Sequence, residues 1–167
     1  MNKADFATWS QIISSIAVLI TLIFLIVQLK QNTNAIKANT RHTIITNDLQ
    51  GISDGIEHPA IERSMYKHEL TEDEKIQLEW WLIGLCRTRE HQWFQFRDGS
   101  LDRRTWEANL SALGRNLSFA RTRGWWNLVS KQYFDHGFAD SVNRYLAGFP
   151  IIHDWVHPFD RIHTASL

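Results

Sequence analysis

The sequence contains a single cysteine, Cys86, and only three prolines, the first of them at position 59. One thiol cannot form a disulfide within the chain, so nothing in the sequence calls for an oxidising compartment. Signals for β-strands are scarce as well, because there is no Asn-Gly turn and no long alternation of β-branched residues. Lys and Arg, 18 together, balance 18 Asp and Glu, so the chain has no net field that would attract nucleic acid. We therefore expect an all-α protein that does not bind nucleic acid.

The sequence also lacks the common motifs of catalysis and cofactor binding. It has no Walker A loop, no Gly-x-Gly-x-x-Gly loop, no Cys-x-x-Cys pair and no nucleophile elbow. These absences remove the usual nucleotide-binding, redox and hydrolase classes, and they favour a binding or structural role over an enzyme. We predict no catalytic residue and no cofactor.

A long apolar run, residues 12–29, is the most informative segment of the chain. Its roughly 18 residues carry no charge, and at 1.5 Å per residue a helix of that length crosses most of a bilayer core. A cleaved signal peptide would end in small residues of the A-x-A type, which are absent here. A buried helix of a soluble domain would show polar residues along one side. We therefore predict a transmembrane helix over 12–29, preceded by a short flank over 1–11, with Trp9 at the membrane interface.

The cations on either side of this run predict its orientation. Lys3 is the only basic side chain before it, whereas Lys30, Lys37 and Arg41 follow it closely. Because positive residues near a membrane helix stay on the cytoplasmic side, we expect the N-terminus outside and the rest of the chain in the cytoplasm. The lone thiol of Cys86 is compatible with that reducing compartment.

Helix signals recur behind the apolar run. No proline or glycine occurs over 30–50, so the first helix is expected to extend through this juxtamembrane stretch and to break over 51–58. Pro59 suits a helix start, Thr71 and Glu74 form a capping box, and Asp102 and Asp135 are N-cap residues. The domain over 51–147 is then a cytoplasmic bundle of about four to five helices, followed by an irregular tail over 148–167. The predicted helices of the bundle are 59–68, 72–97, 103–117, 125–133 and 136–147.

Tryptophan is unusually frequent, with eight in the chain. Each aromatic side chain buries on the order of 150–250 Å² when it is packed. We expect the tryptophans behind the apolar run to fill the core of a small domain rather than to form an exposed binding platform. They are Trp80, Trp81, Trp93, Trp106, Trp125, Trp126 and Trp155.

A stripe of small and polar residues follows the first helix in steps of three and four. Small and hydroxyl side chains let membrane helices approach closely and form hydrogen bonds across the contact. We predict that the stripe is a seam between copies of the chain, or the lining of a narrow pore if enough copies assemble. The alternative is that Ser and Thr bond to their own backbone and that the cytoplasmic part faces water. The candidate residues are Ser14, Ala17, Thr21, Gln28, Asn32 and Asn39.

Charged residues continue an apolar stripe on the predicted helix over 72–97. Arg87 and Glu90 are three residues apart and can pair on one helical face. We predict that Arg87, Glu90 and His91 form a buried polar network that specifies helix packing, because an isolated buried charge is too costly to keep. An acid/base role is the alternative, but no second carboxylate can be placed nearby. The stripe runs through Ile76, Trp80, Ile83, Arg87, Glu90 and Phe94.

The tail is rich in histidine. His153 and His157 have the His-x3-His spacing of a zinc site, with Asp154 and Asp160 as further candidate ligands. Pro158 makes a continuing helix improbable directly after His157, so the spacing does not place the two imidazoles on one face. We predict no metal site. We expect instead a tail loosely docked on the domain by Ile151, Ile152, Trp155 and Phe159.

Several motifs stand in a fixed order along the chain: Gln28-Leu29-Lys30-Gln31-Asn32-Thr33, a short helix after a proline, Arg87 with Glu90-His91, Phe94-Gln95-Phe96-Arg97-Asp98-Gly99, Leu101-Asp102 before Trp106, and Gly124-Trp125-Trp126. In these motifs, residues 6–147 resemble a widespread family of short bacterial single-pass membrane proteins of unknown function. The resemblance implies a bacterial inner-membrane protein with a helical cytoplasmic domain. It implies no activity.

Three functions fit these observations. The leading hypothesis is a membrane-tethered helical interaction module that self-associates through its first helix and offers a cytoplasmic surface to a protein partner. The second is an oligomeric channel or membrane sensor whose pore is lined by the polar stripe. The third is a membrane-bound enzyme with a site near Arg87, Glu90 and His91.

Overall fold

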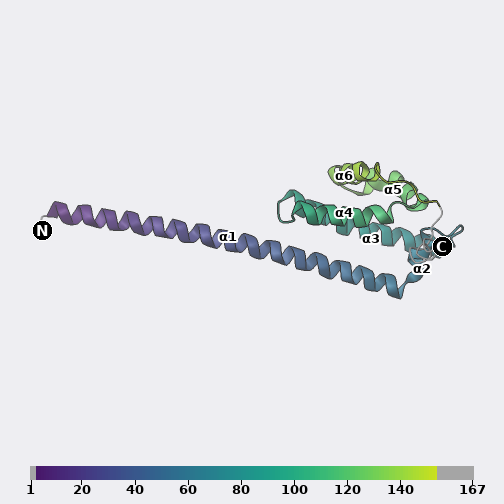
Figure 1. Cartoon of the computed structure of the whole chain (residues 1–167), viewed down its shortest axis with the longest axis horizontal. Coiled ribbons are helices and arrows are strands. Elements are labelled where there is room, and N and C mark those ends of the chain that lie inside the picture. The colour runs from purple at the N-terminus through teal and green to yellow at the C-terminus, as the bar shows by residue number, and fades with distance from the viewer. Residues whose placement is uncertain (1–2, 154–167) are drawn as a thin grey trace, which may run out of the picture. The chain divides into compact units, whose positions relative to one another are not determined.

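The computed structural model describes residues 3–153, with side chains from residue 9 onward. This part of the chain contains six helices, which Figure 1 labels, and one isolated parallel β-bridge between Phe119 and Ile152. The predicted all-α class, a long apolar helix followed by a small bundle, is confirmed. The helices are α1 (Lys3–Glu57), α2 (Pro59–Ser64), α3 (Glu72–Arg97), α4 (Arg103–Asn116), α5 (Ala120–Tyr133) and α6 (His136–Leu146).

The described residues fall into two compact units, divided within α1 between Thr43 and Ile44. The first unit is the helix up to Thr43. The second unit contains the remaining turns of α1 and the bundle of α2 to α6, in which α4 packs against both α3 and α6. The bundle therefore includes part of the stretch that the sequence assigned to a juxtamembrane extension over 30–50.

The predicted break over 51–58 is wrong. α1 continues through Gly51 and Gly55 and ends at Glu57, shortly before the first proline of the chain. A glycine inside a helix costs only about 1 kcal/mol relative to alanine, which neighbouring contacts can offset. One such contact spans Gly51, since Gln50 Nε2 donates a hydrogen bond to Asp54 Oδ1 one turn later (2.8 Å).

The three predicted N-caps are present, which explains why α3, α4 and α6 begin where the sequence indicated. Thr71 Oγ1 accepts the backbone N–H of Glu74 (3.2 Å), and the Glu74 carboxylate accepts the backbone N–H of Thr71 (2.9 Å). Asp102 accepts the N–H three residues further on (3.0 Å), and Asp135 the N–H two residues further on (2.7 Å). The pKa of the Glu74 carboxyl is lowered, chiefly because Lys67 Nζ donates a hydrogen bond to it and secondly because the backbone N–H of Thr71 does so.

α2 is shorter than predicted, because it ends at Ser64 rather than at residue 68. The guanidinium of Arg121 explains the early end. It donates to the backbone carbonyls of Ser64, Lys67 (2.7 Å) and His68 (3.1 Å). These carbonyls would otherwise be left unpaired in the turn between α2 and α3, so a cation on α5 fixes the shape of that turn.

α5 begins at residue 120 rather than at residue 125, and Gly124 lies inside the helix instead of before it. Side chains of the first turn of α5 explain the early start, because they bond the last carbonyls before it. The Thr122 hydroxyl donates to the carbonyl of Asn116 (2.6 Å), and Arg123 Nε donates to that of Leu117 (2.8 Å). α4 and α5 are therefore joined by a tight turn rather than by a long loop.

A cluster of aromatic rings around Phe138 forms much of the core. The ring of Phe138 is fully buried, and its centroid lies 6.0 Å from that of Trp126, 6.4 Å from Trp93 and 6.5 Å from Trp106. The ring of Phe134 stacks on that of Trp126, with the two centroids 5.4 Å apart. Because these side chains come from α3, α4, α5, α6 and the residue that ends α5, one cluster joins four helices of the bundle.

Not every tryptophan fills the core as predicted. Trp93, Trp106 and Trp126 are buried, whereas Trp81 and Trp125 are half-buried and Trp80 is exposed. Trp155 lies outside the described residues. The expectation that tryptophan fills the core is therefore correct for three of the described side chains and wrong for Trp80.

The segment after α6 returns to the start of α5. The backbone N–H of Ile152 donates to the carbonyl of Ser118 (2.8 Å), and the N–H of Ala120 donates to the carbonyl of Ile152 (3.0 Å). Ile152 packs against the core, while Ile151 is exposed. The predicted docking through Ile152 is thus present, and the part assigned to Trp155 and Phe159 lies outside the described residues.

Candidate functional site

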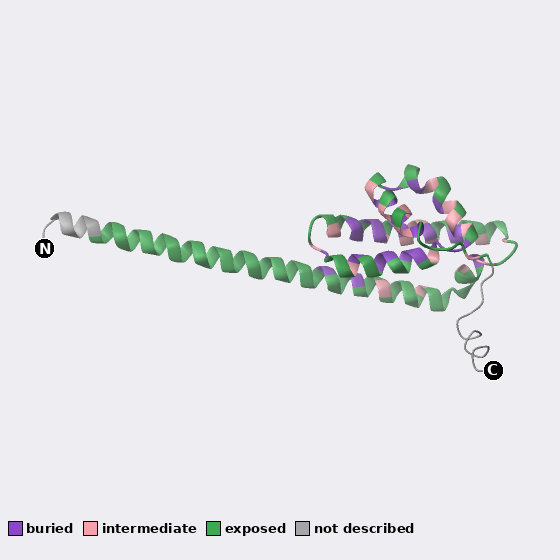
Figure 2. Ribbon diagram, turned by 45° about the horizontal axis from the view of Figure 1, so that its top comes forward, coloured by how far each residue is buried: buried purple, intermediate pink, exposed green. Residues whose placement is uncertain are grey.

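α1 carries the most unusual surface in the described chain. Every side chain from Trp9 to Asn39 is exposed, as Figure 2 shows, and thirteen of those between Ile12 and Leu29 are large and apolar. Within the described residues, α1 is the one helix that is long and apolar enough to cross a membrane. Length, composition and full exposure are all consistent with a single membrane span.

The structure places the predicted seam on this helix, and all of its residues are exposed there. Ser14, Ala17 and Thr21 lie within the apolar part of α1, and the other three candidates follow behind them. The Thr21 hydroxyl donates a hydrogen bond to the carbonyl of Ala17 (2.9 Å), which is the back-bonding that the sequence raised as the alternative. The hydroxyl oxygen of Thr21 can still accept a hydrogen bond from a neighbouring helix.

Arg87 and Glu90 pair as predicted, but His91 does not join them. Glu90 is buried; one of its oxygens accepts from Arg87 Nη1 (2.6 Å) and the other from the backbone N–H of Asp135 (2.6 Å). The Arg87 guanidinium also lies over the ring of Phe134, 5.0 Å from its centroid. His91 is exposed, so its place in a buried network is wrong. With its two oxygens bonded to Arg87 and to the Asp135 backbone, Glu90 links α3 to the loop before α6.

The apolar beginning of the predicted stripe on α3 does not face the core, although Glu90 further along it is buried. Ile76 and Trp80 are exposed by 53% and 69%, although the sequence placed them in the core. The buried face instead follows 78, 82, 86, 89 and 93, which lies about 120° around the helix from the predicted stripe. The middle of α3 is apolar on most sides, so its periodicity could not select the face that the other helices cover.

Arg89 belongs to a buried polar group that the sequence analysis missed. Its side chain is buried, and Nη1 forms an ion pair with Asp48 of α1 (2.8 Å) and donates to Gln92 Oε1 (2.9 Å). This contact ties the last turns of α1 to α3 within the second unit. The partner, Asp48, lies far away in the sequence, so no local spacing could have indicated the pair.

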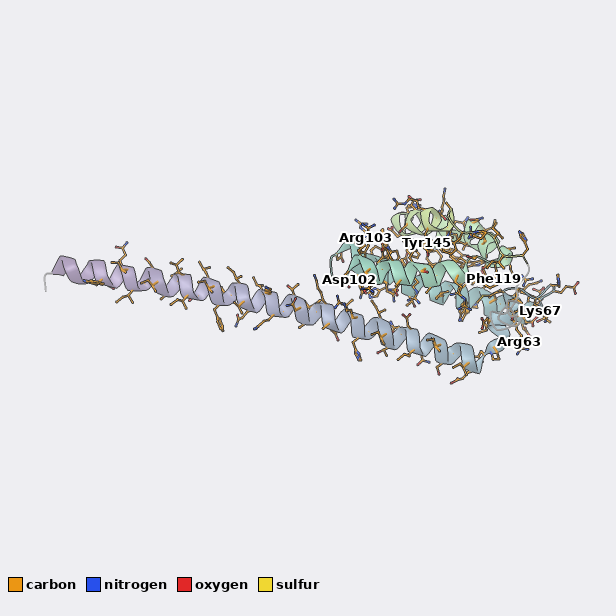
Figure 3. The ribbon with its side chains drawn as sticks, viewed as in Figure 1. Arg63, Lys67, Asp102, Arg103, Phe119 and Tyr145 are labelled. Carbon is orange, nitrogen blue, oxygen red and sulfur yellow. The ribbon has the colours of Figure 1, made fainter. Side chains whose placement is uncertain are left out.

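A groove of about 640 Å³ opens in the bundle beside α3 and α5. Leu70, Leu78, Leu82 and Trp125 give it apolar walls, and their area suits the body of an apolar side chain or small ligand. Part of its lining follows Lys67 in the turn between α2 and α3, and Figure 3 labels Lys67 and Phe119 at this end of the bundle. The remaining lining residues are His68, Glu69, Lys75, Glu79 and Arg121.

Charges of both signs surround this groove, so it suits a neutral or zwitterionic segment better than a polyanion. The indole N–H of Trp125 is buried and has no hydrogen-bond partner among the described residues. Trp126, the next residue, instead donates its indole N–H to Asn143 Oδ1 (2.8 Å) from within the core. No sequence signal predicted this groove: Trp125 was expected in the core, and the Gly-Trp-Trp motif contributed only to the family resemblance. The two indoles of that motif have different roles.

No metal site is present in the part of the chain that the structure describes. His153 is exposed there, and no group of three or more His, Cys, Asp or Glu side chains is arranged to hold an ion in residues 3–153. His157, Asp154 and Asp160 lie outside those residues, so the predicted absence of a zinc site over 153–163 stays a prediction.

Cys86 is expected to be unreactive in the folded protein. Its side chain is fully buried on α3, and burial raises the pKa of the thiol far above its usual range. We predict that a thiol reagent such as iodoacetamide modifies Cys86 at least about 100-fold more slowly in the native chain than in the denatured one, because the thiolate is the reactive form. Mass spectrometry of samples taken over time measures the rates. Equal rates with and without denaturant would contradict the buried position.

Comparisons with protein-family models, curated proteins and solved structures find no match to this chain. The resemblance of residues 6–147 to a bacterial membrane-protein family therefore stays a prediction. Two features of the molecule bear on its function, the exposed apolar helix and the bundle with its groove.

Proposed function

We propose that this protein is a single-pass membrane protein that self-associates through α1 and presents a helical interaction domain in the cytoplasm. The observation that carries the proposal is the exposure of the thirteen large apolar side chains between Ile12 and Leu29. Burying one such side chain is worth about 1.5–3 kcal/mol, so leaving them all half-exposed in water costs on the order of 10 kcal/mol or more. A free-energy cost of that size is comparable with the whole stability of a domain, and inserting the helix in a bilayer removes the cost.

Flanking charge supports the orientation. Lys30, Lys37 and Arg41 follow the apolar stretch, and such residues favour the cytoplasmic side. The bundle, with its single buried thiol, then lies in a reducing compartment. The family that the sequence resembles adds the bacterial inner membrane as the location.

The groove supports an interaction role for the cytoplasmic domain. Its walls of Leu70, Leu78, Leu82 and Trp125 fit an apolar side chain of a protein partner, and its rim offers both cations and anions. An enzyme centred on Glu90 is less well supported, because the Arg87 guanidinium and the Asp135 N–H occupy its two oxygens.

The first test measures the mass of the full-length protein in nanodiscs by light scattering, with lipid and scaffold contributions subtracted. We expect a defined oligomer that the triple change Ser14→Leu, Ala17→Leu and Thr21→Leu reduces to smaller species, because bulky side chains keep the helices apart. The matched control is Ile16→Leu, Ile23→Leu and Ile26→Leu on the opposite side of α1.

Three outcomes separate the parts of this proposal. A wild-type monomer would contradict self-association while leaving the membrane anchor in place. A chain that stays soluble and monodisperse without detergent would contradict the anchor itself. An oligomer that conducts ions in planar bilayers would replace the interaction module with a channel lined by the polar stripe.

A further inference from the structure

The part of α1 that belongs to the second unit has one side covered by the bundle and an apolar side that is uncovered. Ile44 is buried in the core, whereas Ile45, Leu49, Ile52 and Ile56 are between 58% and 75% exposed. Most large apolar side chains elsewhere in the second unit are buried or half-buried. Four exposed ones on a single stretch of helix therefore form an unpartnered surface, here called the juxtamembrane seam.

The spacing of the juxtamembrane seam is that of a coiled coil. The steps from Ile45 to Leu49, Ile52 and Ile56 are four, three and four residues. At 100° per residue, the four side chains fall within an arc of about 60° on the helix. In a heptad, such steps assign Ile45 and Ile52 to position d, and Leu49 and Ile56 to position a.

The same heptad register, counted back along the sequence, reaches the predicted membrane seam. Positions a and d then include Ser14, Ala17, Thr21 and Gln28. None of the a and d residues between Ser10 and Ile56 is Asp, Glu, Lys or Arg, although α1 contains six such residues from Lys30 onward. One heptad pattern thus joins residues over 10–28 that are small or polar, apart from Phe24, to large, apolar residues over 45–56.

The residues that flank the juxtamembrane seam are compatible with a second copy of this chain as its occupant, because they bring no charge repulsion. In a parallel coiled coil, positions e and g of neighbouring copies flank the a and d core. Here they are Thr46 and Ser53 at e, and Asp48 and Gly55 at g. The carboxylate of Asp48 already pairs with Arg89 of its own chain, so no like charges meet across the contact.

The buried area explains why the membrane anchor matters. Each of these side chains removes on the order of 100 Å² from water when it is fully buried, so two copies would bury roughly 500 Å² at the observed exposure. A stable interface needs about 1,200 Å² or more. The juxtamembrane seam is too small to hold free copies together, but anchored copies have a high effective concentration and need less.

We infer that Ile45, Leu49, Ile52 and Ile56 form the core of a parallel coiled coil with other copies of this chain. Leu or Ile at position a with Ile at position d favours three or four strands over two. Copies inserted in one membrane orientation meet in parallel and in register. The inference rests on the proposed function, because it identifies the cytoplasmic part of the self-association proposed for α1.

Cross-linking in membranes tests the contact directly in the full chain. Leu49→Cys places a thiol at position a, and Gln50→Cys places one at the exposed neighbouring position b. With a mild oxidant, we expect a disulfide-linked dimer for Leu49→Cys at least 10-fold faster than for Gln50→Cys. The native Cys86 is fully buried and contributes no background. Equal rates for the two variants would overturn the seam, because they would reflect random collision.

Two added lysines test whether the juxtamembrane seam holds the oligomer together. Leu49→Lys with Ile56→Lys puts two cations on the seam, and Thr43→Lys with Gln50→Lys puts the same charges on an exposed face of the same helix. We expect the first variant to lose at least half of the wild-type oligomer mass in nanodiscs and the second to keep it. Circular dichroism checks that both variants retain helix.

The outcomes separate this inference from the proposal beneath it. If the Leu replacements at Ser14, Ala17 and Thr21 dissociate the oligomer while Leu49→Lys with Ile56→Lys leaves it intact, self-association stands and the juxtamembrane seam is overturned. If Leu49→Lys with Ile56→Lys keeps the wild-type oligomer mass but no longer binds a different protein or the lipid surface, the juxtamembrane seam is likewise overturned as a contact between copies. A wild-type monomer overturns both.

Discussion

Replacing Trp126 with alanine is expected to destabilise the bundle by about 3–5 kcal/mol. The indole is fully buried, stacks on Phe134 and meets the edge of Phe138, so its removal leaves a large cavity at the centre of the core. The change also leaves Asn143 without the indole N–H that it accepts at 2.8 Å. We expect the midpoint of thermal unfolding, followed by circular dichroism in detergent, to fall by at least about 12 °C.

Trp125→Ala is the matched control, because the same residue type stands next in the chain. Trp125 is half-buried beside the groove, and its indole N–H has no partner among the described residues. Its loss should cost about 1 kcal/mol, or a few degrees in the midpoint. Similar shifts for the two variants would mean that the core is not centred on Trp126.

Asp48→Ala is expected to be the most damaging change on the surface of the bundle. Arg89 is buried, and Asp48 is its only acidic partner among residues 9–153. Removing one partner of a buried pair leaves an uncompensated charge, which costs about 3–5 kcal/mol when both groups are buried. Because Asp48 is partly exposed, solvent screens the pair, and we expect about 2–3 kcal/mol.

A second variant separates lost charge from lost packing. Arg89→Met combined with Asp48→Ala removes both charges and keeps a side chain of similar length in the core. We expect the double variant to recover most of the stability that Asp48→Ala loses, measured as the midpoint of chemical denaturation of the solubilised chain. A double variant no more stable than Asp48→Ala would show that packing of the Arg89 stem, rather than its charge, holds α1 to α3.

Local signals explain which parts of the fold could be predicted from the sequence. The capping residues Thr71, Asp102 and Asp135 act within three residues of themselves, so their roles can be read from neighbouring letters. The apolar run over 12–29 is equally local, since length and hydropathy define it. The Arg87–Glu90 pair was also predictable, because both members lie on one helical face.

The predictions that were wrong, or that could not be made, depend on which face of each helix its neighbours cover. α3 is apolar on most sides, so only its neighbours decide that Leu82 is buried and Trp80 is exposed. The shape of the turn after α2 depends on Arg121, more than fifty residues later. The groove has the same origin, because its walls come from α3, α5 and the turn between α2 and α3.

The return of Ile152 to the start of α5 has a consequence for biosynthesis. Its two backbone hydrogen bonds close the bundle with residues that leave the ribosome roughly 95 positions after the end of α1. At 5–20 residues per second, about 5–20 s separate the emergence of the two segments. If α1 enters the bilayer as it is made, the bundle completes itself beside the membrane only after this delay. During it, the part of the core against which Ile152 packs stays uncovered, and nascent chains that stop before Ile152 leave it exposed to proteases and chaperones.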